Sequence, residues 1–251
     1  MATIKDFAQD LVKNVISTGF FDKIKINATG SDIVIESIDK DRTVVLKGLI
    51  KNNTTKDMKG EFGLTNLSLL QHIVSDPEFS KAESNMHVLT KKDEKTGDEI
   101  PTELSYINKS KSYINYRFMP LSLVPNQPTF REQEWDVVVS EPSKESIQQF
   151  TWAASGLSAY EQYIIPKVVD KQLRFYIGEE NSAAQRGGVV IADNVEGKFD
   201  YGMQWRTGLI LAVLKLASTS HCTLYFSKKG AFQVEIDTGV GVYKFIFPSK
   251  A

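Results

Sequence analysis

The chain contains two pairs of amphipathic helix patterns that recur at nearly the same spacing. One pair joins a helix that begins near Ile4 and is closed by Gly19 to a helix over Ser143 to Leu157, which Ser143 can cap and Gly156 helps to end. The other pair joins Leu64 to Ser75 and Arg206 to Ala217. The members of each pair lie about 140 residues apart, as expected for a duplicated unit. The repeat predicts two similar halves whose sequences have diverged.

Short runs rich in Ile and Val lie between the helices, and turn residues separate them. In the first half the predicted strands are Lys23 to Asn27, Asp32 to Ser37, Thr43 to Ile50, Glu61 to Gly63, Met86 to Thr90, Thr102 to Ile107 and Tyr113 to Met119. In the second half they are Trp135 to Val139, Tyr163 to Val168, Gln172 to Gly178, Val189 to Asp193, Lys198 to Gln204, Cys222 to Ser227, Ala231 to Ile236 and Val240 to Phe247. The predicted fold class is α+β, with two similar domains. Each domain consists of an antiparallel sheet and two helices that pack on one of its faces.

The length of 251 residues suits two domains of ordinary size. We expect an N-terminal domain over 1–122, a connector over 123–133 and a C-terminal domain over 134–251. The segment from Met119 to Gln133 holds three prolines, which is typical of an extended connector. Its Leu121, Leu123 and Val124 either pack along a domain surface or help to line a groove for a partner.

Composition narrows the possible functions. A net charge of −1 and a pI near 6.3 disfavour a protein whose whole surface binds nucleic acid, although a local basic patch is compatible with them. The single cysteine excludes an internal disulfide, and the three histidines lack the spacing of a zinc site, so we expect no metal and no cofactor. The chain shows no targeting segment and no apolar run long enough to span a bilayer, so we expect an intracellular protein.

Two motifs could indicate an enzyme. Asp237-Thr238-Gly239 matches the triplet of aspartic protease active sites, but it lies between two strand patterns, has no second copy and is typical of a hairpin turn. His221 and Cys222 are neighbours on a predicted strand, so their side chains should point to opposite faces and leave a buried structural cysteine. We therefore predict that the protein is not an enzyme.

The predicted outward faces of the helices are polar, with one exception. The first helix presents Asp6, Asp10 and Lys13, and the third presents Glu145, Gln148, Gln149 and, unexpectedly, Trp152. The fourth helix is apolar nearly all round, and Lys215 should point outward from it.

Three stretches carry a resemblance to a known family. They are GEFGLTNLSLLQHIVSDPEFS, SKESIQQFTWAASGL and LAVLKLASTSHCTLYFSKKG, each of which places a helix and its flanking turn or strand in the same order. Together with the duplicated plan, they resemble the sliding DNA clamps, and most of all the clamp of T-even-type bacteriophages. The likeness spans most of the chain and is strongest from Trp135 to its end.

The resemblance implies a homotrimeric ring that encircles duplex DNA, tethers the replicative DNA polymerase and is loaded by an ATP-driven clamp loader, in the cytoplasm of an infected bacterial cell. A clamp performs no chemistry. The residues implied in contacts with DNA phosphates are Lys5, Lys13, Lys144, Arg206 and Lys215. Those implied in a groove for partner peptides are Leu121, Leu123, Val124, Phe247 and Pro248.

The charge of the helix faces departs from the family, because Asp6, Asp10 and Glu145 share these faces with the lysines. Two other functions stay open at this stage. One is a viral structural or assembly protein built from duplicated α+β domains, and the other is a hydrolase that uses Asp237.

Overall fold

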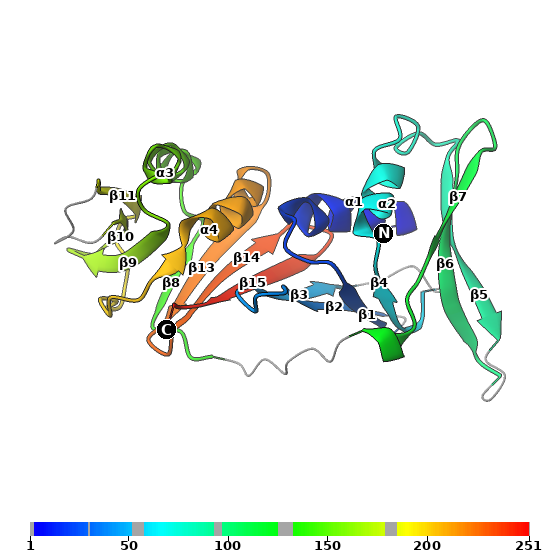
Figure 1. Cartoon of the computed structure of the whole chain (residues 1–251), viewed down its shortest axis with the longest axis horizontal. Helices are drawn as coiled ribbons and strands as arrows, with labels where there is room; N and C mark the ends of the chain where they lie inside the picture. Colours follow the sequence, from blue (N-terminus) through cyan, green and yellow to red (C-terminus); the bar gives the residue numbers. More distant parts are fainter. Residues whose placement is uncertain are drawn as a thin grey trace. The chain divides into compact units, whose positions relative to one another are not determined.

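The computed structural model describes residues 3–29, 31–51, 58–92, 97–124, 133–178 and 185–250. The chain forms two compact units, coloured from blue to green and from green to red in Figure 1. Unit 1 comprises Met1–Thr129 with Gly239–Tyr243, and unit 2 comprises Phe130–Thr238 with Lys244–Ala251. Most of the predicted connector over 123–133 lies outside the described residues.

Unit 1 contains two antiparallel sheets. The first has the order β4-β1-β2-β3, with β1 at Ile24–Ala28, β2 at Ile33–Ile38, β3 at Val45–Ile50 and β4 at Gly60–Leu64. Burial alternates residue by residue along β1, β2 and β3, so one face is in the core. The second sheet has the order β5-β6-β7, with β5 at Asn85–Lys92, β6 at Glu99–Ile107 and β7 at Tyr113–Arg117.

Two helices cover unit 1 on one side and pack against each other (Figure 1). Helix α1 spans Ile4–Asn14, begins with a capping box between Thr3 and Asp6, and continues into the 3₁₀-helix η1 at Ile16–Thr18. Gly19 closes this run with φ at 72°, as the sequence predicted.

Helix α2 spans Leu67–Val74, inside the predicted range of Leu64 to Ser75. Asn66 is the N-cap, in the left-handed region at φ 52°, and no side chain caps the helix. The Thr65 carbonyl accepts a hydrogen bond from the buried Tyr116 hydroxyl, so Thr65 belongs to the end of the sheet. Asn tolerates the left-handed conformation that this sharp entry into the helix requires. A short 3₁₀-helix, η2 at Leu121–Leu123, follows β7.

Unit 2 also contains two antiparallel sheets. One has the order β11-β10-β9-β12, and the other the order β15-β14-β13-β8. Their bounds are β8 Val137–Ser140, β9 Tyr163–Val169, β10 Gln172–Ile177, β11 Gly187–Ala192, β12 Trp205–Arg206, β13 His221–Ser227, β14 Ala231–Asp237 and β15 Val242–Pro248.

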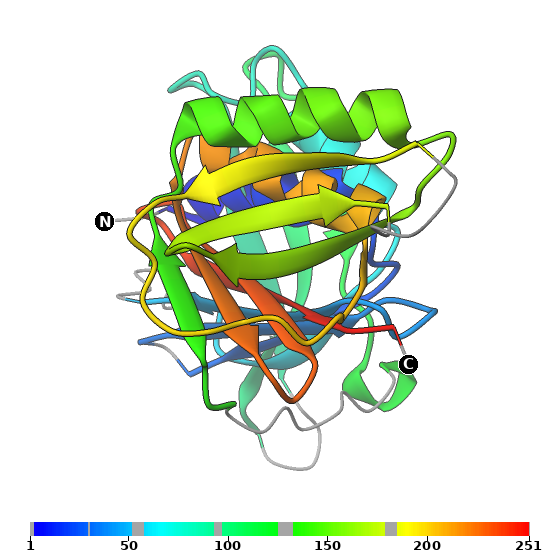
Figure 2. The same cartoon turned by 90° about the vertical axis from the view of Figure 1, so that its left-hand side faces the viewer.

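Helix α3 at Lys144–Leu157 lies along the first of these sheets, where it packs on β11 and β10 (Figure 2). Ser143 is its N-cap, as predicted, and its hydroxyl accepts the Ser146 N–H at 3.0 Å. Helix α4 at Thr207–Leu214 packs against α3 and continues into the 3₁₀-helix η3 at Lys215–Ser218. The two-domain α+β fold class is therefore confirmed.

The predicted strand at Lys198 to Gln204 is wrong, because this segment is irregular up to Trp205. Its alternation arises from Phe199, which is buried and whose ring centre lies 5.4 Å from that of Phe226. Gly202, at φ 65°, turns the backbone out of the extended conformation. A loop anchored by one aromatic residue therefore produced the periodicity of a strand.

Candidate nucleic-acid interface on the helix faces

Helix α1 exposes one cation and uses its first acidic residue as a cap. Lys13 is exposed near the end of the helix. Asp6 Oδ2 accepts the Thr3 N–H at 2.7 Å, and this backbone hydrogen bond lowers the pKa of the Asp6 carboxyl. The Asp6 carboxylate therefore caps the N-terminal end of the helix, where the positive end of the helix dipole stabilises a negative charge.

Asp10 does not share this outward face, contrary to the sequence prediction. Its side chain is 7% exposed, and it accepts hydrogen bonds from the Tyr243 hydroxyl at 2.6 Å and from Asn14 Nδ2 at 2.8 Å. Burial and the Asp10 carboxylate raise the pKa of Tyr243 well above its ordinary value. The Asp10 carboxylate therefore points into unit 1 and is not on the exposed face with Lys13.

The Lys5 ammonium is hydrogen-bonded to other groups of unit 1. It donates to the Lys81 carbonyl at 2.9 Å and to Ser84 Oγ at 2.9 Å, and it lies 5.5 Å from the centre of the Phe79 ring. These partners belong to the turn between α2 and β5. The structure thus gives the Lys5 ammonium a role in holding this turn to α1.

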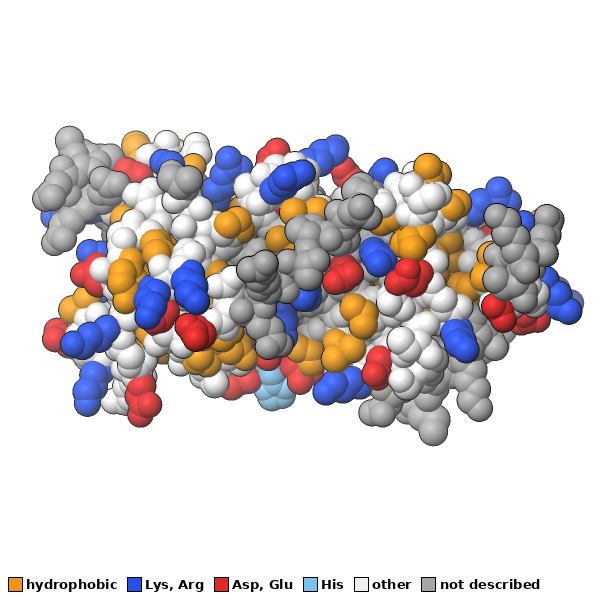
Figure 3. All heavy atoms as spheres, turned by 90° about the horizontal axis from the view of Figure 1, so that it is seen from below, with side chains coloured by type: hydrophobic (Ala, Val, Ile, Leu, Met, Phe, Trp, Pro, Cys, Tyr) orange, Lys and Arg blue, Asp and Glu red, His pale blue; other side chains and the backbone are white. Residues whose placement is uncertain are grey.

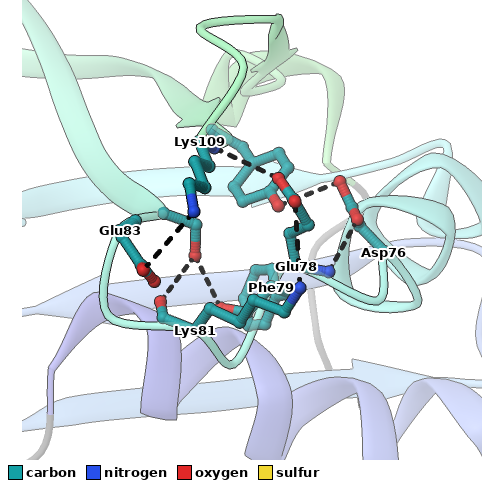
Figure 4. Close-up of polar contacts among 8 residues, drawn as sticks. Asp76, Glu78, Phe79, Lys81, Glu83 and Lys109 are labelled. Carbon is teal, nitrogen blue, oxygen red and sulfur yellow. Dashed lines mark hydrogen bonds and ion pairs between the residues drawn. The ribbon is translucent and has the colours of Figure 1, made fainter.

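The same turn is cross-linked by further polar contacts (Figure 4). Asp76 accepts the Glu78 N–H at 2.8 Å and the Tyr106 hydroxyl at 2.9 Å. Glu78 accepts the Lys109 N–H at 3.2 Å, and Lys109 Nζ lies 4.0 Å from a Glu83 oxygen. The turn is therefore a braced structural element of unit 1.

Helix α3 presents a polar face opposite its buried stripe of Ile147, Phe150 and Ala154. Lys144, Glu145, Gln148 and Gln149 are exposed on it. Trp152 lies on the same face and is 81% exposed. The sequence correctly predicted that this aromatic side chain points away from the core.

Helix α4 carries a cation at each end. Arg206 is its N-cap residue and Lys215 its C-cap residue, and both are exposed. A hollow of about 660 Å³ lies between α3 and the start of α4, and Arg206, Gly208, Leu209 and Ser155 are among its lining residues. This hollow gives a charged ligand room to approach the Arg206 guanidinium.

The helix cations differ from many cations of the strands and loops. Lys167, Lys228 and Lys244 each form an ion pair, at 3.0 Å with Asp200, 3.3 Å with Asp136 and 3.5 Å with Glu235 respectively. Within the described residues, no ion pair involves Lys13, Lys144, Arg206 or Lys215. Figure 3 shows a face away from the helices, on which basic and acidic side chains are interspersed. The four helix cations are thus available to an anionic partner.

The residues implied in a partner groove differ in exposure within their own units. In unit 1, Leu123 is 62% exposed, whereas Val124 is buried and fills the space above Gly63, where a Cβ atom would overlap its Cγ2. In unit 2, Phe247 is buried in the core and Pro248 is exposed. Leu121 is half-buried. Leu123 and Pro248 are therefore the members of this set whose side chains are open to solvent.

The two enzyme-like motifs have the structural roles that the sequence predicted. Asp237 ends β14, and Gly239, at φ 78°, turns the chain toward β15. Cys222 is buried, and desolvation raises the pKa of its thiol to about 12. His221 is exposed and pairs with Glu141 at 2.9 Å. The thiol and the imidazole thus lie on opposite faces of β13, which rules out a nucleophile pair.

Further observations concern metals and membranes. Over the described ranges, no group of three or more His, Cys, Asp or Glu side chains is arranged to hold a metal ion. Within the same ranges, every helix is too short or too polar to cross a lipid bilayer.

No protein-family model and no curated protein sequence matches the chain. Solved structures do match over nearly its whole length. A structure of the C-terminal region of FEN-1 bound to A. fulgidus PCNA matches with a TM-score of 0.72 and 10% identity, over 98% of this chain and 96% of that one. Proliferating Cellular Nuclear Antigen from Entamoeba histolytica matches with a TM-score of 0.68 and 14% identity, over 97% of this chain and 96% of that one. The chain therefore has the PCNA fold across both units.

Proposed function

We propose that this protein is a sliding clamp that encircles duplex DNA and tethers a replicative DNA polymerase to its template. The supporting observation is that the PCNA fold covers 97–98% of the chain, while α1, α3 and the two ends of α4 expose four cations that have no ion-pair partner among the described residues: Lys13, Lys144, Arg206 and Lys215. The sequence resemblance to T-even-type phage clamps, found independently of the fold, agrees with this proposal. Three chains supply the six units of the ring.

The contact with DNA is electrostatic and independent of base sequence. Lysine and arginine side chains neutralise phosphates and release counterions, so each contact adds to the salt dependence of binding without reading a base. Lys5 contributes less than the other four, because its ammonium is hydrogen-bonded within unit 1. A net charge of −1 suits a ring that holds DNA by topology and must slide along it.

The protein recruits its partners through a surface and performs no reaction itself. A. fulgidus PCNA has been captured with the C-terminal region of FEN-1, which supports a groove for the C-terminal tail of a polymerase or clamp loader here. Leu123, the exposed apolar residue of η2 in unit 1, is the one that we assign to this groove. An ATP-driven loader opens and closes the ring.

Two measurements test this function. Light scattering should give a mass of about three times the 28.2 kDa of one chain, because an isolated chain cannot surround DNA. Primer extension on a singly primed circular template should yield longer products only when the clamp, its loader and ATP accompany the polymerase. A monomeric mass together with unchanged product length would contradict the proposal.

A further inference from the structure

Trp152 is the most exposed large hydrophobic side chain in the part of the chain that the structure describes, at 81%. The other two tryptophans contribute to packing in unit 2. Trp205 is 2% exposed and donates its indole N–H to the Phe247 carbonyl at 2.9 Å, and the Trp135 ring lies 5.4 Å from that of Tyr225. Helix α3 buries its opposite side, so the fold does not require an indole at position 152. A ligand that covers this ring would gain the free energy of removing its apolar area from water.

Trp152 continues a line of exposed side chains along α3. Lys144, Gln148 and Trp152 follow one another at four-residue spacing, which makes each the neighbour of the next on the helix surface. The line presents an ammonium group, an amide and an indole in that order. Gln149 and Ser155, which are also exposed beside it, are polar.

This combination fits a nucleic acid better than a protein partner. A protein-docking patch is a contiguous apolar surface, whereas the indole of Trp152 stands among amides and hydroxyls. An ammonium group binds phosphate, and an indole stacks on the face of a nucleobase. Helix α4 and η3, which pack against α3, add the exposed and unpaired cations Arg206 and Lys215. Among the described residues, Glu145 is the one exposed carboxylate on this face of α3, against the three cations Lys144, Arg206 and Lys215, so the surroundings of Trp152 favour an anionic, base-bearing strand.

The accessibility of the base faces decides whether duplex or single-stranded DNA binds the Trp152 indole more strongly. In a duplex the bases stack on one another and present only their edges in the grooves, whereas in a single strand their faces are accessible. We infer that Trp152 stacks on unpaired bases of single-stranded DNA adjoining the duplex that the clamp holds. This inference rests on the proposed function and adds a single-strand contact to it.

Tryptophan fluorescence tests the contact directly. The probe is an oligothymidylate of about 16 nucleotides, near the upper end of common single-strand site sizes, and a duplex of equal length is the comparison. The oligothymidylate should quench the wild-type emission more strongly than the duplex does. Trp152→Ala should lose this quenching and bind the single strand about tenfold more weakly, and Trp152→Phe should fall between the two.

The control variant is Tyr201→Ala, which removes another exposed aromatic side chain of unit 2 from the irregular segment between β11 and β12. It should bind the oligothymidylate as the wild type does. Equal single-strand affinity of Trp152→Ala and wild type would overturn the inference, and so would a change in the light-scattering mass of Trp152→Ala, which would assign the indole to a contact between subunits. Retention of Trp152→Ala on circular DNA separates the two proposals, because topological attachment does not depend on this side chain.

Discussion

The buried contact between Tyr243 and Asp10 shows how one side chain can change the interpretation of a surface. The two residues are 233 positions apart in sequence, and both are buried in unit 1. Their hydrogen bond removes a carboxylate from the face of α1. The Asp10 carboxylate is a buried charged acceptor. If the Tyr243 hydroxyl is removed, this carboxylate loses one of its hydrogen-bond donors.

Tyr243→Phe should therefore lower the free energy of unfolding by about 1–3 kcal/mol. The Asp10 carboxylate loses a hydrogen-bond donor, and because it is buried, water has little access to replace that donor. Urea denaturation measures this change. Tyr201→Phe is the matched control, since Tyr201 is 49% exposed and should leave stability unchanged. Equal stability of both variants would show that the Asp10 contact does not hold α1 in place.

Asp136 gives a pH dependence with a defined sign. The Lys228 N–H donates to its carboxylate at 2.8 Å, and this hydrogen bond lowers the pKa of Asp136 below its ordinary value of 3.8. A carboxyl whose pKa is lower in the folded state contributes stability that is present above its unfolded pKa and is lost as the pH falls through the folded value. The same direction applies to Asp6 and Asp76.

Asp136→Asn should therefore lose less stability than the wild type between pH 7 and pH 3, because its amide cannot be protonated over this range. Unfolding free energies at the two pH values give the comparison, with Glu145→Gln on the exposed face of α3 as the control. An identical pH response of wild type and Asp136→Asn would contradict the assigned role.

At the scale of elements, the segment that follows β7 offers the clearest test of partner binding. Leu123 projects into solvent, while Val124 packs on Gly63. Leu123→Ala should weaken binding of a polymerase C-terminal peptide by about 1–3 kcal/mol and leave stability unchanged, as expected for an exposed anchor. Isothermal titration calorimetry measures the affinity.

Val124→Ala and Phe247→Ala are the comparison variants for this test. Both remove buried apolar volume, so they should lower stability, which Leu123→Ala should not. Wild-type affinity in Leu123→Ala would place the groove elsewhere.

The elements that the sequence predicted well are those whose determinants are local. The Ser143 cap and the alternation of β1 to β3 depend on neighbouring residues, and both are observed. The errors have tertiary causes. Asp10 is buried beside Tyr243, a residue from the other end of the chain, and Phe199 gives a loop the pattern of a strand. Helical periodicity predicts which side of a helix faces outward. It does not reveal the tertiary partners of a residue, such as Asp10, that lies at the border between the buried and exposed faces.

At the scale of the whole molecule, the proposed ring explains how a nearly neutral protein could hold DNA. Within the described residues, Lys13, Lys144, Arg206 and Lys215 form no ion pair, whereas several lysines of the strands do. A closed ring adds a topological constraint that requires no tight binding, so few phosphate contacts suffice.

The most direct test of this account is retention on DNA of two topologies. The protein is loaded with its loader and ATP onto a nicked circle and onto the same DNA after linearisation, and the bound fraction is followed by gel filtration at raised salt. A ring should stay on the circle and slide off the free ends of the linear form. Equal loss from both molecules, or equal retention on both, would contradict topological attachment.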